Sequence, residues 1–249
     1  LLPWLEEHGY DMAYQQKTHG KADGVLVAWR AARFDCLARR AVEFEHEPGC
    51  DPRPEEALEY GAPASTAGVA LAAVLRAKED PRVVLSVGTS HIWWVHEMKR
   101  VKNMQIQRVI TLVEESARAA VAEAFADPAE ARCLLLLGLD MNTEPNDEPY
   151  QVATHLFDFK SLADHMPAAA RGCGWTNITE KYQGWIDHIM CKQLRLAGTA
   201  PLPQVVLVSA NALPSAAEVM RAGKVTGYPD TAHGSDHVPL VCTLALLGG

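Results

Sequence analysis

The chain of 249 residues is 48% hydrophobic and 22% charged, a globular composition with enough apolar side chains for one sizeable core, and we expect a single domain over 1–249. Its formal net charge of -8 excludes a protein that holds nucleic acid mainly by a broad basic surface, but it suits a hydrolase that gathers carboxylates around a metal ion. No apolar run reaches the length of about 18 residues that a transmembrane helix needs, so we expect no membrane partner.

Short apolar runs bounded by turn residues predict strands along most of the chain. In chain order these runs cover 24–29, 83–87, 133–137, 185–190, 205–208 and 238–246. Between the second and third runs, apolar residues recur near helical spacing over 98–125, which predicts one long helix. This loose alternation of strands and helices favours an α/β or α+β layered domain.

The secondary structure of two further segments is less clear from their sequence. The Pro-rich stretch 48–63 predicts a surface loop inside the domain. Residues 67–75 are rich in Ala and Leu, so that propensity alone favours a helix, although their place just before another strand also suits a sheet. The residues by themselves leave this choice open.

The cysteines form no CxxC pair and no regular spacing, which indicates neither a zinc site nor a disulfide scaffold. They are Cys36, Cys50, Cys133, Cys173, Cys191 and Cys242. We therefore expect a reducing, intracellular compartment, the cytoplasm rather than mitochondria or the nucleus. Residues 1–5 lack an initiator Met, a basic leader and a cleavage site, so we expect them to be the interior of a longer chain from which any targeting segment is missing.

Asp140 and Asn142 follow a predicted strand in the segment Gly-Leu-Asp-Met-Asn at 138–142. Residues two apart in an extended backbone point the same way, so a carboxylate and an amide oxygen would share one face. Together they could hold a hard cation such as Mg²⁺, or hold a water for deprotonation. The alternative is that both side chains only make turn hydrogen bonds after the strand.

The triplet Ser235-Asp236-His237 leads into the last apolar run. Asp236 is a candidate metal or phosphate ligand, and the His237 imidazole could donate to a phosphoryl oxygen. Because neighbours in a strand face opposite ways, Asp236 cannot orient His237. Asp187 is the available partner, since a lone carboxylate in the apolar run 185–190 is costly unless it is paired. The alternative for Asp187 is a buried structural ion pair.

A third candidate is His91, which follows the predicted strand 83–87 in Thr89-Ser90-His91. It could protonate a leaving oxygen or bind phosphate. A single His in such a place is more often a satisfied core or surface residue. None of the three segments decides the function alone.

Their order along the chain carries more information. In chain order, a predicted strand ends in Thr-Ser-His at 89–91, the long helix follows, and a second predicted strand leads into Gly-Leu-Asp-Met-Asn at 138–142. Gly-Trp-Ile-Asp-His-Ile at 184–189 and Ser-Asp-His-Val-Pro-Leu at 235–240 come after it. This series resembles the endonuclease/exonuclease/phosphatase superfamily. The segments Gly9-Tyr10-Asp11, Ala22-Asp23-Gly24-Val25 and Trp175-Thr176-Asn177 are similar to its branch of poly(A) deadenylases, nocturnin, Angel proteins and the 2',5'-phosphodiesterase.

The resemblance implies a four-layer α/β sandwich, in which two packed, mainly antiparallel sheets are flanked by helices, and it implies a strand at 67–75. It also implies dependence on Mg²⁺ or Mn²⁺, with Asp140, Asn142 and Asp236 as metal ligands. Asp140 would in addition position or deprotonate the attacking water.

The remaining site residues follow from the same resemblance. His237 would stabilise the pentavalent phosphorane, and Asp187 would fix its tautomer. His91 would contact the scissile phosphate as a catalytic and binding residue, and Asn142 and Asn177 would contact substrate. The chain departs from the family's Asn-Thr-His at Thr89-Ser90-His91, and it has His188 where the family usually has Tyr after the Asp.

The superfamily also has an early Asn and a Gln-Glu pair whose Glu is the principal Mg²⁺ ligand, both upstream of the segment that matches residues 1–5. We therefore expect an N-terminally truncated catalytic domain that lacks the first strands. A metal site built from Asp140 and Asn142 alone should then be weak, which leaves the activity of this fragment open.

The function that the resemblance implies is Mg²⁺-dependent phosphodiester hydrolysis in RNA degradation, by a 3'-to-5' exoribonuclease of the deadenylase type or a 2',5'-oligoadenylate phosphodiesterase. Its partner would be single-stranded RNA or an oligoadenylate, and no protein partner is inferred. Two alternatives stay open: a non-catalytic scaffold domain that keeps the fold, and a nocturnin-like phosphatase of a small phosphorylated molecule.

Overall fold

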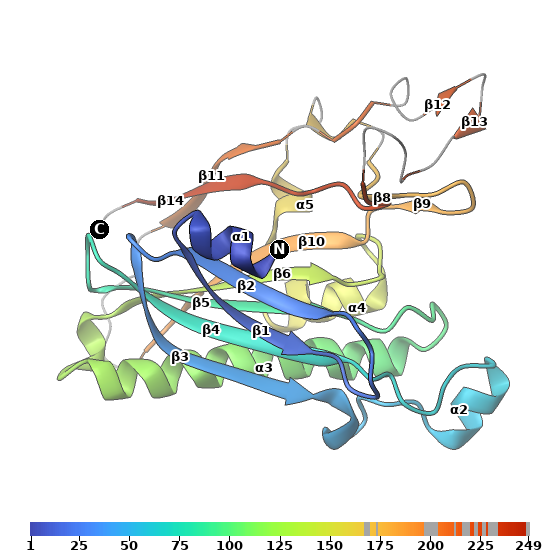
Figure 1. Cartoon of the computed structure of the whole chain (residues 1–249), viewed down its shortest axis with the longest axis horizontal. Helices are drawn as coiled ribbons and strands as arrows, with labels where there is room; N and C mark the ends of the chain where they lie inside the picture. Colours follow the sequence, from blue (N-terminus) through green and yellow to red (C-terminus); the bar gives the residue numbers. More distant parts are fainter. Residues whose placement is uncertain are drawn as a thin grey trace.

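The structure is a computed structural model that describes residues 1–166, 170–172, 174–196, 204–211, 213–215, 220–221, 224–225, 228 and 234–247. A six-stranded sheet forms its centre (Figure 1). The strand order is β3 (Phe34–Glu43), β4 (Val69–Ala77), β5 (Val83–His91), β6 (Arg132–Asp140), β10 (Asp187–Leu194) and β7 (Lys160–Ser161).

The pairing of β5 with β6 is parallel, whereas every other pair in the central sheet is antiparallel. Parallel neighbours need a crossover connection, and the long helix α3 (Lys99–Ala124) provides it. The fold is therefore α/β with a mixed central sheet. Both the long helix and the strand expected at 67–75 are confirmed, the latter as β4.

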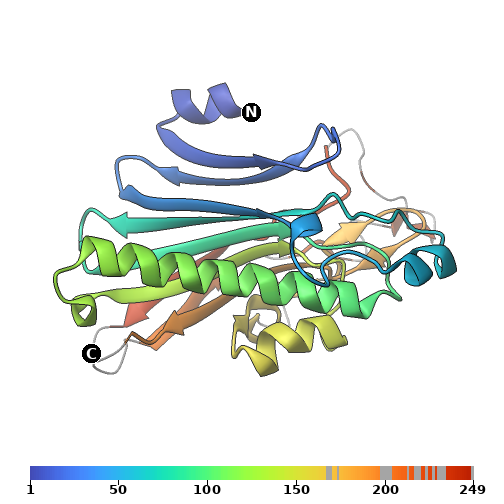
Figure 2. The ribbon, with the colours of Figure 1, turned by 90° about the horizontal axis from the view of Figure 1, so that it is seen from below.

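Helix α3 covers one face of the sheet, and Figure 2 shows it running along the strands. Its buried stripe, which includes Val109 and Val113, packs with alternate residues of the strands, such as Val84 on β5 and Leu135 on β6. The alternation follows from the two-residue period of a strand. Residues between these positions on β5 and β6 face away from α3.

A hairpin of β1 (Tyr10–Gln16) and β2 (Gly24–Arg30) covers part of the opposite face. Val27 and Trp29 of this hairpin join one apolar cluster with Leu71 and Leu75 of β4. Helix α1 (Leu2–Glu7) precedes the hairpin and lies on its outer side (Figure 2). The turn between β1 and β2 reaches the sheet edge where β5 and β6 end.

The C-terminal part places another strand pair, β11 (Gln204–Ala210) and β14 (Cys242–Leu247), over β10 (Figure 1). The short strands β8 (Asn177–Ile178) and β9 (Gln183–Gly184) form a separate small hairpin. Val238 and Leu240 pack with Met166 and Trp185 in a small apolar cluster. This packing holds the segment 235–238 next to the start of β10.

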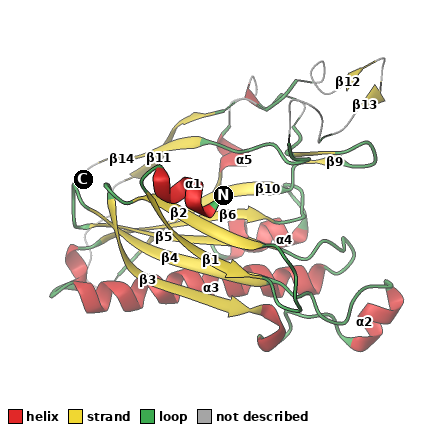
Figure 3. Ribbon diagram, in the orientation of Figure 1, coloured by secondary structure: helices red, strands yellow, loops and turns green. Residues whose placement is uncertain are grey.

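The other elements are short, as Figure 3 shows. They are η1 (Phe44–His46), α2 (Pro54–Glu59), η2 (Pro128–Glu130), α4 (Glu148–Gln151), η3 (Val152–Leu156), α5 (Leu162–His165), β12 (Met220–Arg221) and β13 (Lys224–Val225). Among the described residues, no helix combines the length and apolar character needed to cross a membrane. The described cysteines are free thiols, and Cys173 lies outside the described residues.

Three sequence predictions need correction. The stretch 48–63 is not a continuous loop, because it contains α2, and Pro54 suits the first turn of a helix. The strand expected over 238–246 begins only at Cys242, since residues 238–241 form a connecting segment without strand structure. The strand expected from 185 begins at Asp187. The residue before it, Ile186, accepts a hydrogen bond at its carbonyl from the backbone N of Met141, outside the ladder of β10.

Replacing Gly88 by Ala should destabilise the protein by about 1–3 kcal/mol, the usual cost of overpacking a core. An added Cβ would overlap Val113 Cγ2 and lie 3.1 Å from Leu137 Cδ2. The matched control is Gly138→Ala on the neighbouring strand, where nothing lies within 4 Å of the added Cβ. Urea unfolding measures both variants, and an equal loss in the two would contradict the packing of α3 on β5.

Candidate active site

Three titratable residues lie side by side where strands of the central sheet reach one edge. His91 at the end of β5 is opposite Asp140 at the end of β6, and Asp140 is opposite Asp187 at the start of β10. Side chains opposite one another on adjacent strands point to the same face. For these residues it is the face away from α3, because the neighbouring Leu139 belongs to the core beneath that helix.

His237 joins this group from a distant part of the chain. It forms an isolated β-bridge with Asn177, and the next backbone N, of Val238, donates to the Thr176 carbonyl at 2.6 Å. The His237 ring then places Nδ1 at 2.9 Å from Asp187 Oδ2 and Nε2 at 4.0 Å from Asp140 Oδ2. One imidazole thus faces two carboxylates, one through each ring nitrogen.

The hydrogen bond to Asp187 raises the pKa of His237 to about 9, against the opposing effect of burial. His237 is therefore protonated at neutral pH, and its Nδ1–H donates to Asp187. The position of Asp187 is itself fixed by Thr176, whose buried Oγ1 accepts from the backbone N of Ile186 at 2.9 Å and of Asp187 at 3.0 Å.

Asp140 also contacts His91, whose Nε2 lies 3.4 Å from Asp140 Oδ2. Burial raises the pKa of Asp140, and the charge of the nearby His91 opposes this rise. Burial likewise lowers the pKa of His91, and here the Asp140 carboxylate acts in the other direction. The carboxylate of Asp140 is thus half-buried between two imidazoles.

A lysine from the β1–β2 turn extends the group beyond His91. Lys17 Nζ lies 3.2 Å from His91 Nδ1 and 2.5 Å from Asp23 Oδ2. The contact with Lys17 lowers the pKa of Asp23. This pair brings a fixed cation to the side of His91 that faces away from Asp140.

Asn142 does not share an extended strand with Asp140. Its φ of 47° lies in the left-handed region, which Asn tolerates better than most residues. Its backbone N donates to Asp140 Oδ1 at 3.0 Å, and its Nδ2 donates to the Ile92 carbonyl at 2.9 Å. The expected extended backbone over 140–142 is therefore corrected: Asn142 orients Asp140 through its main chain and ties the end of β6 to the residue after β5.

Asp236 and Asn177 form a separate pair at the rim of this group. Asn177 Nδ2 donates to Asp236 Oδ2 at 3.3 Å. Among the described residues, the acidic and imidazole ligand atoms that lie within 4.8 Å of one another at this edge belong to Asp140, Asp187 and His237. The structure thus brings Asp187, rather than Asp236, next to Asp140.

Sequence reasoning did not assign Lys17, Thr176 or Lys102 to the site. Lys102 Nζ donates to the carbonyl of Asn142 at 2.6 Å, and burial lowers the pKa of Lys102 to about 8. A signal for Lys102 was available, because a lysine next to Val101 within the apolar stripe of a helix needs a buried partner. Thr176 stands in the segment Trp175-Thr176-Asn177 that carries the resemblance, but that pattern did not indicate its bonds to the start of β10.

His188 lies in the core instead of the site. Its Nε2 is 2.8 Å from the Thr143 carbonyl, and its ring packs 5.1 Å from that of Tyr150. Burial lowers the pKa of His188 to about 4, so it is neutral at pH 7 and donates to Thr143. The side chain of His188 packs on the face of β10 opposite to that of Asp187.

The carboxylates of Asp140 and Asp187 fit a hard divalent cation. Mg²⁺ binds proteins through one or two carboxylates and keeps waters or substrate phosphates as its other ligands. Among the described residues Asp140 has only imidazoles, and no Lys or Arg, within ion-pair distance. A divalent cation bound beside Asp140 would add to the compensation that the imidazoles give its half-buried carboxylate.

Sequence comparison finds distant relatives, although no family model matches the chain. The chain is 26% identical, over 87% of its length and 42% of the relative, to the probable CCR4-Not complex 3'-5'-exoribonuclease subunit Ccr4 of Encephalitozoon cuniculi. It is 23% identical, over 98% of its length and 40% of the relative, to 2',5'-phosphodiesterase 12 of Bos taurus. The chain therefore spans about two fifths of the length of these curated relatives.

Solved structures share the fold at low sequence identity. The human Nocturnin catalytic domain with bound sulfate has a TM-score of 0.63 and 18% identity, covering 98% of this chain and 75% of that one. ANGEL2, a 2',3'-cyclic phosphatase, has a TM-score of 0.70 and 17% identity, covering 98% and 76%. Together with the two sequence relatives, these matches confirm the resemblance to one branch of the endonuclease/exonuclease/phosphatase superfamily.

In metal-free protein, an NMR titration should find His237 with a pKa of about 9, and Asp187→Asn should bring it down toward 6.5. Because the folded-state pKa is the higher one, this pair stabilises the fold fully below pH 6.5 and loses its effect as pH rises through about 9. The difference in unfolding free energy between wild type and Asp187→Asn should shrink over that window. If the pKa of His237 is the same in wild type and in Asp187→Asn, the hydrogen bond between His237 and Asp187 is contradicted.

Proposed function

We propose that this chain, a distant relative of the endonuclease/exonuclease/phosphatase superfamily in the branch of Ccr4, nocturnin, ANGEL and the 2',5'-phosphodiesterase, contains the active site of a metal-dependent phosphodiester hydrolase. The observation that carries the proposal is the geometry at this sheet edge, where His237 is held through Nδ1 by Asp187 and faces the half-buried carboxylate of Asp140 through Nε2. A general base and a cationic hydrogen-bond donor a few ångströms apart are what in-line attack by water on phosphate requires.

Asp140 would take the proton of the attacking water. Burial raises the pKa of this carboxyl, which makes it a stronger base than an exposed aspartate. The backbone N of Asn142 donates to Oδ1, which leaves Oδ2 facing the two imidazoles. Asn142 is thus a positioning residue in this scheme, in addition to its proposed role as a ligand and substrate contact.

His237 would donate from Nε2 to a phosphoryl oxygen as negative charge develops in the transition state. Asp187 holds the ring through Nδ1, so the free N–H points toward the place where phosphate would lie beside Asp140. His91 would contact the same phosphate from the other side of Asp140, with Lys17 adding positive charge behind it.

A Mg²⁺ or Mn²⁺ ion held by Asp140 and Asp187, with Asn142 and Asp236 as the further proposed ligands, would polarise the phosphoryl oxygen and help to orient the water. Asn177, which is paired with Asp236, would contact the substrate next to this group.

The proposed substrate is single-stranded RNA or an oligoadenylate. One relative is a probable 3'-5'-exoribonuclease subunit and the other a 2',5'-phosphodiesterase, so both linkages are candidates. We assign the chain as one catalytic domain over 1–249 that acts in the cytoplasm in RNA degradation. Pairs β1–β2 and β11–β14 would belong to one layer over the central sheet, in a four-layer α/β sandwich.

The purified protein should release adenosine monophosphate from oligoadenylates in the presence of Mg²⁺, and chelator should stop the release. Asp140→Asn and His237→Gln should each lower kcat by at least about 100-fold, the usual contribution of a general base or a charge-stabilising donor. Asp158→Asn is the matched control, because its exposed carboxylate pairs only with Lys160 among the described residues and should leave activity unchanged.

Parallel assays with 3',5'-linked and 2',5'-linked substrates identify the linkage. If neither substrate gives product but a small phosphomonoester or a cyclic phosphate is hydrolysed, the proposed activity would be that of a phosphatase and not that of a nuclease. Absence of any turnover in the full-length protein, with a normal unfolding temperature, would favour a scaffold domain over an enzyme. Equal activity of Asp140→Asn and Asp158→Asn would contradict the assigned site.

A further inference from the structure

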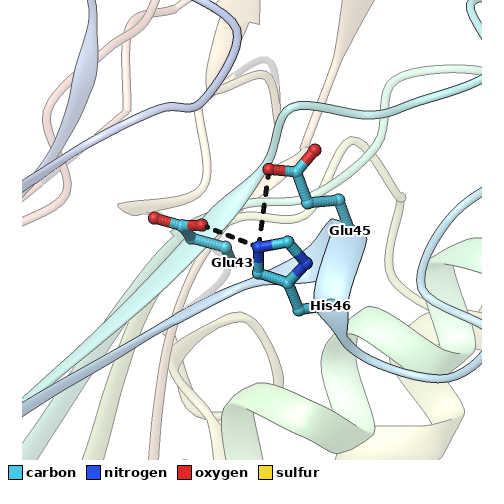
Figure 4. A group of neighbouring side chains, drawn as sticks. All are labelled: Glu43, Glu45 and His46. Atoms are coloured by element: carbon cyan, nitrogen blue, oxygen red, sulfur yellow. Dashed lines mark ion pairs between the residues drawn. The ribbon is translucent and has the colours of Figure 1, made fainter.

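A second group of potential metal ligands lies at the end of β3, outside the candidate active site. It consists of Glu43, the last residue of β3, and of Glu45 and His46 in the short helix η1. His46 Nε2 lies 3.3 Å from Glu43 Oε2 and 4.0 Å from Glu45 Oε1. Figure 4 draws both contacts as dashed lines from the same ring nitrogen. One ligand atom from each residue lies within 4.8 Å of the other two.

These separations are close to those within a tetrahedral zinc site. Zinc bonds of about 2.0–2.1 Å place neighbouring ligand atoms about 3.3 Å apart. The distance from His46 Nε2 to Glu43 Oε2 already equals this value, whereas Glu45 Oε1, 4.0 Å from His46 Nε2, would move closer on binding. The backbone beneath is anchored, because Phe44 between them is fully buried and its N donates to the Gly68 carbonyl at 2.9 Å.

The charge of the group also favours a bound cation. Among the described residues, Glu43 and Glu45 have no Lys or Arg within ion-pair distance, and their recorded partners are imidazoles alone. Two adjacent carboxylates repel each other unless a positive charge lies between them. One imidazole and two carboxylates form a ligand set that suits Zn²⁺ better than Mg²⁺, which prefers oxygen ligands throughout.

A second segment of the chain supports the group from outside. His19, in the turn between β1 and β2, places Nε2 at 2.5 Å from Glu45 Oε2, while the other oxygen of Glu45 faces His46. Carboxylates that bind metals are commonly held by such outer hydrogen bonds. This contact joins the β1–β2 turn, which also carries Lys17, to the end of β3.

We propose that Glu43, Glu45 and His46 form a zinc site, with His19 as the outer partner of Glu45 and a fourth position open to solvent. The site is distinct from the candidate active site. Strand pairing places Glu43 three strands from Asp140, and three spacings of about 4.8 Å separate them by about 14 Å, too far to share an ion. Bound zinc fixes the β1–β2 turn against β3 and thereby holds Lys17 beside His91.

The test is zinc binding to the whole chain, measured by calorimetry in the Asp140→Asn/Asp187→Asn background, which removes the carboxylates of the active site. This protein should bind one Zn²⁺ ion. His46→Asn and Glu43→Gln should each weaken binding by more than about tenfold, because even loss of an outer partner costs about 10–100-fold. His155→Asn, which removes another exposed imidazole, is the matched control and should bind as before.

A cobalt experiment locates the ion directly. His46→Cys should give a thiolate-to-cobalt absorption band on addition of Co²⁺, whereas His155→Cys should not, since thiolates bind such ions only at a site with further ligands. Zinc should also slow trypsin cleavage after Lys21 in the β1–β2 turn. Equal zinc affinity of His46→Asn and His155→Asn, or equal cobalt spectra of the two cysteine variants, would overturn the proposal. These readouts do not depend on hydrolytic activity.

Discussion

The parallel pairing of β5 with β6 is the constraint on which the rest of the site depends. It sets His91 directly opposite Asp140, and the antiparallel pairing of β6 with β10 sets Asp187 on the other side of Asp140. A shift of either register by one residue would turn the affected side chain into the core beneath α3. The crossover helix that makes the parallel pairing also supplies Lys102, which holds the loop after Asp140 by its bond to Asn142.

The electrostatics of the site follow from that placement. The half-buried carboxylate of Asp140 would be unfavourable by itself, and two imidazoles compensate its charge in different ways. His237 is a cation fixed by Asp187, whereas burial lowers the pKa of His91. The two imidazoles on one carboxylate are thus shifted in opposite directions, the pKa of His237 upward by Asp187 and the pKa of His91 downward by burial.

Much of this arrangement could be predicted from the sequence, because periodicity marked the long helix and most strands, and because the motif order implied that Asp140, Asp187, His91 and His237 converge. The conformation at Asn142 could not be predicted, since a left-handed residue follows from the way two strand ends meet and not from local pattern. The approach of Lys17 to His91 was equally inaccessible, because it depends on how a hairpin packs across the sheet. The helix that begins at Pro54 was not predicted, because a Pro-rich stretch is typical of a loop although proline also suits the first turn of a helix.

In the proposed mechanism one phosphate binds between Asp140, His91 and His237. A crystal structure with Mg²⁺ and an oligoadenylate made resistant by phosphorothioate linkages tests this binding mode. A linkage phosphate should lie within hydrogen-bond distance of His237 Nε2, with the metal ion bound to Asp140 or Asp187. A linkage phosphate bound elsewhere on the sheet edge, with His237 and Asp140 still in contact only with each other and with Asp187, would contradict it.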